Sequence, residues 1–201
     1  MIFNNNEIKN ILFDLGNVLL DTDLKLTIEE FKKLGIADIS KNLINRDNEN
    51  FYYNFEKGFV SSDDFISKIN IDNNLNLTHQ QFNYAWNKML LSIKNEKIEF
   101  LKILKNKYKI YLLSNSNQIH IDFIENQDYW HDDLFDKKFY SHQMGLRKPE
   151  LEIYKQVLIK AKIEAENTLF IDDLEININA AKELNFNTIL YKNISLENIF
   201  I

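Results

Sequence analysis

The sequence contains no cysteine. Disulfide frameworks, zinc sites built from thiolates and enzymes with a cysteine nucleophile all depend on that residue. These classes of protein are therefore excluded before any pattern in the sequence is considered.

The sequence also lacks an excess of positive charge. Its 24 lysines and arginines stand against 30 acidic residues, which gives a formal net charge of −6 and a pI of about 5.3. Proteins that bind nucleic acids usually present a basic surface, because contacts to phosphates supply most of their affinity. The lysine-rich runs 102–109 and 137–138 are typical of solvated faces. We therefore expect no nucleic-acid partner.

Long apolar runs are missing as well. No stretch approaches the roughly 20 residues that a membrane-spanning helix needs, and residues 1–7 lack the basic segment and apolar run of a signal peptide. The chain shows no internal repeat and no coiled-coil heptad. We therefore expect a cytoplasmic protein without membrane contact, present as a monomer or a weak homodimer.

What the sequence does contain is an alternation of strand and helix patterns, in a chain that is 45% hydrophobic. Short apolar runs predict buried parallel strands at 8–14, 109–114, 168–172 and 188–191, with a weaker candidate at 138–141. Amphipathic patterns predict helices at 96–107, 118–126, 150–162 and 176–184. This order is typical of a doubly wound, Rossmann-like α/β fold, in which a parallel sheet carries helices on both faces.

One long stretch breaks the alternation. Residues 23–91 show no convincing strand but four helical patterns, at 24–34, 48–57, 61–69 and 78–91. Ser61 and Thr78 look like helix N-caps, and Thr78 forms a capping box with Gln81. We expect an inserted all-helical cap over residues 21–92 and a Rossmann-like core made of residues 1–20 and 93–201. A short helix or an extended tail is expected at 196–201.

Polar residues follow the predicted strands at the point where each strand ends. They are Asp14, Ser114, Asn115, Asp172 and Asp173. The carboxyl ends of parallel strands converge on one crevice, so these side chains can meet there. A loop before the third of these strands adds Lys148.

Such a cluster predicts a phosphate and metal site. Clustered carboxylates repel one another, and burial strengthens the repulsion. Lys148 and a divalent cation would neutralise them, and Mg²⁺ is suited because it binds carboxylates together with water and phosphate oxygens. The Ser114 hydroxyl and the Asn115 amide could hold phosphate oxygens. Together these groups provide what phosphoryl transfer requires, a placed nucleophile and fixed positive charge.

Four motifs carry a resemblance to a known family over nearly the whole chain. They are ILFDLGNVLLD at 11–21, LSN at 113–115, GLRKPE at 145–150 and FIDDLEIN at 170–177. On these motifs the sequence resembles the haloacid dehalogenase superfamily of phosphatases. The resemblance implies a Mg²⁺-dependent hydrolase that acts on small phosphorylated metabolites through an aspartyl-phosphate.

The resemblance also implies a role for each matching residue. Asp14 would be the nucleophile and a metal ligand, and Lys148 would neutralise phosphate and orient Asp14. Ser114 and Asn115 would bind the transferring phosphoryl group. The remaining metal ligands would be Asp173, with Asp172 in support, and the backbone carbonyl of Gly16.

Gly16 is a departure from the family pattern. Most of these phosphatases carry an aspartate there, which protonates the leaving oxygen, and losing such an acid can cost ~10²–10⁴-fold in rate. An anomeric sugar oxygen is a better leaving group than an ordinary alkoxide, so it depends less on protonation by such an acid. The first motif, the SNSN run at 114–117 with His120 and the stretch 51–61 with Glu56 and Gly58 are similar to the α-D-glucose-1-phosphate phosphatase branch. That similarity implies sugar-phosphate specificity and makes Glu56 a candidate substrate-binding residue.

Other interpretations remain open. The chain could be a phosphate-binding or regulatory domain of the same fold with weak catalysis, which the glycine at position 16 motivates. Phosphoryl transfer between sugar hydroxyls also needs the missing acid, and dehalogenation needs no metal, so both are disfavoured. Asp21 and Asp23 are expected to stabilise the exit of the chain into the cap rather than to perform chemistry, although Asp21 is near enough in sequence to be a reserve acid.

Several further side chains are expected to be structural. Phe55, Tyr84 and Trp86 are assigned to the cap core rather than to a sugar-stacking platform. Arg147 is assigned to the surface. His120 has an open role, in contact with substrate or purely structural.

Overall fold

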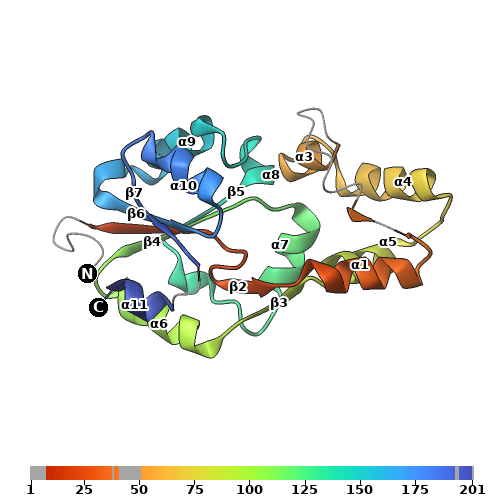
Figure 1. Cartoon of the computed structure of the whole chain (residues 1–201), viewed down its shortest axis with the longest axis horizontal. Helices are drawn as coiled ribbons and strands as arrows, with labels where there is room; N and C mark the ends of the chain where they lie inside the picture. The colour runs from red at the N-terminus through yellow and green to blue at the C-terminus, as the bar shows by residue number, and fades with distance from the viewer. Residues whose placement is uncertain (1–7, 38, 41–50, 193–194, 201) are drawn as a thin grey trace.

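A parallel sheet of five strands forms the centre of the protein (Figure 1). The computed structural model describes residues 8–37, 39–40, 51–192 and 195–200. The strand order is β5-β4-β1-β6-β7. The strands are β1 (Asn10–Phe13), β4 (Lys109–Ser114), β5 (Lys137–Tyr140), β6 (Thr168–Asp172) and β7 (Asn187–Leu190). All five predicted strands are present and parallel, including the weak candidate that became β5.

Alternation along the strands explains why both faces of the sheet carry helices. In β1, Ile11 and Phe13 point to one hydrophobic cluster and Leu12 points to another, and β4 and β6 alternate in the same way. The first cluster takes in α6 (Asn95–Lys105), α7 (Gln118–Glu125) and α11 (Leu196–Phe200). The second takes in α9 (Leu151–Ala161) and α10 (Glu175–Lys182). The doubly wound α/β fold is therefore confirmed.

Helices inserted after β1 form a separate layer at one end of the molecule, on the right in Figure 1. We call four of them the cap: α1 (Leu24–Lys33), α3 (Phe51–Glu56), α4 (Ser62–Asn73) and α5 (His79–Asn87). They pack around an aromatic cluster that includes Phe31, Phe65, Phe82 and Trp86. Part of the helix predicted at 48–57 lies outside the described residues.

The predicted starts of two cap helices are confirmed. Ser61 Oγ accepts a hydrogen bond from the backbone N–H of Asp64 at 3.1 Å, and Thr78 forms the expected capping box with Gln81. Asp23 caps α1, as its expected role at the exit into the cap requires.

The absence of strands in the inserted stretch was a wrong prediction. Leu20–Thr22 (β2) and Leu90–Ile93 (β3) form an antiparallel pair, so the helix predicted at 78–91 ends at Asn87 and a strand follows. Each strand is short, and its partner lies about seventy residues away along the chain. Pairing of that kind is decided by tertiary contact rather than by local pattern. As a result, the chain enters and leaves the cap through two adjacent strands.

Three short helices complete the described structure. They are α8 (Ser141–Met144) and the 3₁₀ turns η1 (Asp132–Leu134) and η2 (Ala165–Asn167). Across the described ranges, no helix has both the length and the apolar character needed to cross a membrane.

Candidate active site

Lys148 joins two acidic strand ends at the carboxyl edge of the sheet. Its Nζ lies 2.7 Å from Oδ1 of Asp14 and 2.7 Å from Oδ2 of Asp172. Asp14 directly follows β1, where its N–H donates to the carbonyl of Ile171 in the neighbouring strand. Lys148 is only 2% exposed and Asp172 is fully buried. Residues that are 134 positions apart are thus held in one ion-paired group.

Burial and charge set the protonation of this group. Burial raises the pKa of Asp14 to about 7, against the lowering effect of Lys148, and Asp172 adds to the rise. Burial alone would lower the pKa of Lys148, but the two carboxylates bring it above its ordinary value. Burial also raises the pKa of Asp173, which a hydrogen bond from Asn17 partly offsets. The Lys148 ammonium contacts two of these three carboxyl groups, so further positive charge would stabilise all three in ionised form.

The same three carboxyl groups fit a divalent cation. Oxygens of Asp14, Asp172 and Asp173 all lie within 4.8 Å of one another. Asp14, Gly16 and Asp173 line a common pocket of about 260 Å³. An all-oxygen donor set with more negative charge than one lysine can neutralise suits a hard cation.

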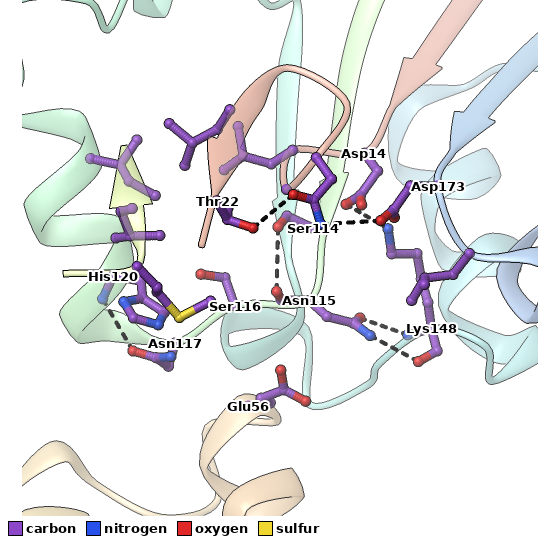
Figure 2. Close-up of a pocket in the computed structure, with 18 of the residues that line it drawn as sticks. Asp14, Thr22, Glu56, Ser114, Asn115, Ser116, Asn117, His120, Lys148 and Asp173 are labelled. Carbon is purple, nitrogen blue, oxygen red and sulfur yellow. Dashed lines mark hydrogen bonds and ion pairs between the residues drawn. The ribbon is translucent and has the colours of Figure 1, made fainter. Parts of the chain in front are cut away.

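Asp172 differs from its neighbour in its contacts. Its carboxylate accepts hydrogen bonds from Asn177 Nδ2 at 2.9 Å and from the backbone N–H of Leu174 at 2.8 Å, besides the contact to Lys148. These partners hold the loop after β6 and leave Asp173 at the pocket wall (Figure 2).

Asn17 is a site residue that the sequence analysis missed. Its Nδ2 donates to Oδ2 of Asp173 at 3.2 Å, and its Oδ1 accepts from the Thr22 hydroxyl at 2.8 Å. Its backbone is left-handed, with a φ of 56°, which asparagine tolerates better than most residues. Its position inside the first motif was the available signal.

Ser114 and Asn115 lie beside this group but differ in their contacts. Ser114 ends β4, is buried and lines the pocket. The Asn115 side chain donates from Nδ2 to the carbonyl of Lys148 at 2.9 Å and accepts from the Lys148 N–H at 2.8 Å. Asn115 therefore fixes the loop that carries the lysine. Contact of either residue with a phosphoryl group stays a prediction.

The cap meets the core on one side of the pocket through Glu56. Its carboxylate pairs with Arg147 at 2.9 Å and accepts from the Tyr52 hydroxyl at 3.0 Å. The Arg147 guanidinium also lies over the ring of Tyr53, 4.0 Å from its centroid. The assignment of Arg147 to the surface was wrong, because its partners come from the cap and not from nearby sequence. Glu56 lines the pocket, and burial raises its pKa despite the neighbouring arginine.

A second contact between cap and core lies at His120. Its ring stacks on Trp86, with centroids 5.4 Å apart and planes at 10°, and its Nδ1 lies 2.9 Å from Oδ1 of Asn87. His120 comes from α7 of the core, and both partners come from α5 of the cap. Burial lowers the pKa of His120 to about 3, so the ring is neutral at physiological pH. Asn117, from the same turn, also lines the pocket.

Asp21 and the aromatic residues assigned to the cap core lie outside the ion-paired group. Asp21 pairs with Lys94 at 3.2 Å and Lys97 at 3.0 Å. Burial would raise its pKa, but the two lysines keep it below the ordinary value, which disfavours the reserve-acid role. Phe55 and Trp86 belong to the cap core as expected, whereas Tyr84 is exposed and lies beneath the ammonium of Lys88.

Comparisons with known proteins agree with this arrangement. The family model described as haloacid dehalogenase-like hydrolase matches residues 8–185. A D-ribitol-5-phosphate phosphatase of Bacteroides thetaiotaomicron is 30% identical over 186 residues, which cover 90% of each chain. The chain therefore belongs to the haloacid dehalogenase-like hydrolases, as a phosphatase that hydrolyses phosphoric monoesters.

Solved structures extend the similarity to the fold. The wild-type structure of a haloacid dehalogenase family enzyme from Bacteroides thetaiotaomicron, in complex with magnesium and inorganic phosphate, matches with a TM-score of 0.90. It is 34% identical, and the match covers 96% of this chain and 100% of that one. A predicted haloacid dehalogenase-like family hydrolase from Porphyromonas gingivalis matches with a TM-score of 0.86 at 32% identity, and the match covers 96% of each chain.

Proposed function

We propose that this protein is a Mg²⁺-dependent phosphatase of small polyol or sugar phosphates that works through an aspartyl-phosphate on Asp14. One observation carries the proposal. Lys148 is buried between Asp14 and Asp172, at the base of a pocket whose wall also holds Asp173 and Ser114. A nucleophile, a fixed positive charge and a set of metal ligands are thereby gathered around a space of the size of a small phosphate ester.

Each residue has a part in the reaction. An oxygen of the Asp14 carboxylate would form a bond to phosphorus while the bond from phosphorus to the leaving alcohol breaks. Lys148 favours the ionised form of Asp14 and would orient it, and Ser114 would donate to a phosphoryl oxygen. With no acid at position 16, the leaving oxygen would take its proton from water. A water molecule would then attack phosphorus, break its bond to Asp14 and release inorganic phosphate.

Asp14, Asp173 and the carbonyl of Gly16 would hold Mg²⁺, with Asp172 in support. When bound, the ion supplies charge neutralisation to the carboxylates and to the phosphoryl oxygens. Glu56, paired with Arg147, would contribute to the end of the pocket that receives the alcohol.

The substrate class follows from the size of the pocket and from the relatives. A volume of about 260 Å³ suits a short phosphorylated polyol or a monosaccharide phosphate. The similarity to a D-ribitol-5-phosphate phosphatase favours an open-chain polyol phosphate as the first substrate to test. Glucose 1-phosphate, which the motif forms imply, is the second.

Phosphate release with and without Mg²⁺ tests the proposal. Asp14→Asn should lower release of phosphate from D-ribitol 5-phosphate to background, and a chelator should do the same to the wild type. Asp133→Asn, a change at an exposed aspartate, is the matched control and should retain activity. Activity that survives either treatment rejects the mechanism. Mg²⁺-dependent binding of phosphate esters without hydrolysis would instead identify a binding domain.

A further inference from the structure

Asn117, at the start of α7, offers an unused pair of hydrogen-bond donors to the pocket. Its Oδ1 accepts the backbone N–H of His120 at 3.1 Å, which caps the helix and fixes which way the amide points. The residue is 1% exposed, and within the described part of the chain its Nδ2 is buried without a hydrogen-bond partner. A buried donor without a partner is unfavourable, because the group has lost its hydrogen bond to water without gaining another. A ligand in the pocket that Asn117 lines could remove that cost.

His120, one turn later, offers the complementary group. Asn87 Oδ1 can only accept a hydrogen bond, so Nδ1 of the neutral ring carries the hydrogen and Nε2 keeps its lone pair. Among the described residues, the hydrogen bond to Asn87 is made by Nδ1 and none is made by Nε2, and the ring lines the same pocket. Stacking on Trp86 fixes the plane of the ring. Figure 2 shows Asn117 and His120 next to each other, away from Asp14 and Lys148.

A donor beside an acceptor matches a hydroxyl group, which accepts from one and donates to the other. A phosphate dianion would satisfy Asn117 but would place oxygen lone pairs against Nε2 of His120. An alkyl chain would leave both side chains unpaired, and a site built to bind hydroxyls rejects ligands that lack them.

We propose that Asn117 and His120 form a hydroxyl-binding subsite, by which this protein selects phosphate esters of polyhydroxylated alcohols. The inference rests on the proposed function in one respect, that the phosphate end lies at Asp14 and Lys148. Because Trp86 and Asn87 hold His120 from the cap, the subsite is complete only when the cap is docked on the core.

Equilibrium binding tests the subsite without requiring turnover. Calorimetry on Asp14→Asn protein with Mg²⁺ would compare D-ribitol 5-phosphate with pentyl phosphate, which has the same chain length and no hydroxyls. Asn117→Ser keeps a helix-capping side chain but removes the amide donors, and His120→Phe keeps an aromatic ring on Trp86 but removes both nitrogens. Each change should weaken binding of ribitol 5-phosphate at least tenfold and change binding of pentyl phosphate less than about threefold.

The subsite would be overturned if a variant lost equal affinity for both ligands. It would also be overturned if neither variant lost affinity for either ligand. The same holds if Asp14→Asn protein with Asn117 and His120 unchanged binds ribitol 5-phosphate no more tightly than pentyl phosphate. Thermal unfolding of each variant identifies a loss caused by misfolding, in which case the other variant decides. Selective binding without any hydrolysis by the wild type would reject the proposed function and leave the subsite standing. Hydrolysis without selectivity in binding would reject the subsite alone.

Discussion

The ammonium of Lys148 lies 2.7 Å from Oδ1 of Asp14, in a place where the lysine is almost fully buried. A lysine in such a place is stable as a cation only because two carboxylates contact it, and burial raises the pKa of Asp14 to about 7 in spite of that contact. These groups are therefore mutually dependent: removing Lys148 leaves two buried carboxylates without their cation, whereas removing Asp14 leaves Lys148 paired with Asp172.

Lys148→Met should remove activity and lower stability together. Loss of the buried cation should cost roughly 3–5 kcal/mol of unfolding free energy, and the rate of phosphate release should fall by at least ~10²-fold. Urea unfolding and phosphate release measure the two effects. Lys102→Met, at a half-exposed lysine paired with Glu99, is the control and should change both by little. A stable but inactive Lys148→Met protein would mean that the pair is not a source of stability.

Asp173 and Asp172 should differ in what their asparagine variants lose. Asp173→Asn, at the pocket wall, should raise the Mg²⁺ concentration needed for half-maximal activity by about 10–100-fold, with little change in unfolding free energy. Asp172→Asn should chiefly destabilise the fold, because the buried carboxylate contacts Lys148, Asn177 and the Leu174 N–H. Magnesium titrations and urea unfolding of both variants separate the roles. The reverse assignment would show that Asp172 is the principal ligand.

The location of the strand-end residues at one edge of the sheet could be predicted, because the apolar pattern of the preceding residues specifies each strand. The apolar run before Asp14 specifies β1, and a parallel sheet brings its carboxyl end beside that of β6. The pairing of side chains around the site could not be predicted in this way. Asn115 holds Lys148 across 33 positions, and Arg147 meets Glu56 across 91. The sequence analysis missed β2 and β3 for the same reason, since each forms a strand only by pairing with the other, which is distant in sequence.

Gly16→Asp tests whether the missing acid limits the rate. A side chain at this position would have room, because the nearest atom to an added Cβ is the Thr22 methyl at 3.9 Å. The backbone of Gly16 is also outside the left-handed region. If protonation of the leaving oxygen is limiting, hydrolysis of an alkyl ester such as ribitol 5-phosphate should rise about tenfold or more.

The gain should be absent with 4-nitrophenyl phosphate, whose leaving group needs no acid. Gly16→Ala is the matched control, since it fills the same space without a carboxyl group and should give no gain. A gain with alanine, or an equal gain on both substrates, would contradict the assignment of the acid role to position 16.

Gly58 allows the cap to approach the core closely. It has a φ of +73°, and an added Cβ would overlap the carbonyl oxygen of His142. Gly58→Ala should therefore separate α3 from α8, displace Glu56 from Arg147 and lower kcat/KM by about tenfold or more. Gly35→Ala is a suitable control, because its φ of +97° carries a similar backbone cost while the nearest atom is a flexible Leu75 methyl at 3.4 Å. Equal effects of both changes on kcat/KM would show that backbone strain alone is responsible.

His120 should make the fold sensitive to acid. Burial lowers the pKa of the folded ring from 6.5 to about 3. Between these pH values the ring is therefore protonated in the unfolded protein and neutral in the folded protein. The contribution of this group to the free energy of unfolding is fully present above pH 6.5. Below that pH it falls by about 1.4 kcal/mol per pH unit, until the pH reaches about 3.

Urea unfolding at pH 7 and pH 5.5 measures that loss. Between these pH values the wild type should lose on the order of 1 kcal/mol more than His120→Phe, whose ring takes no proton. His79→Gln, at an exposed histidine of the cap, is the control and should lose as much as the wild type. Equal losses in the wild type and in His120→Phe would mean that the folded ring takes up a proton at the same pH as the unfolded ring. Below pH 6.5 its Nε2 would then be a donor that attracts phosphate as well as a hydroxyl, which would remove the physical basis for selection at those pH values.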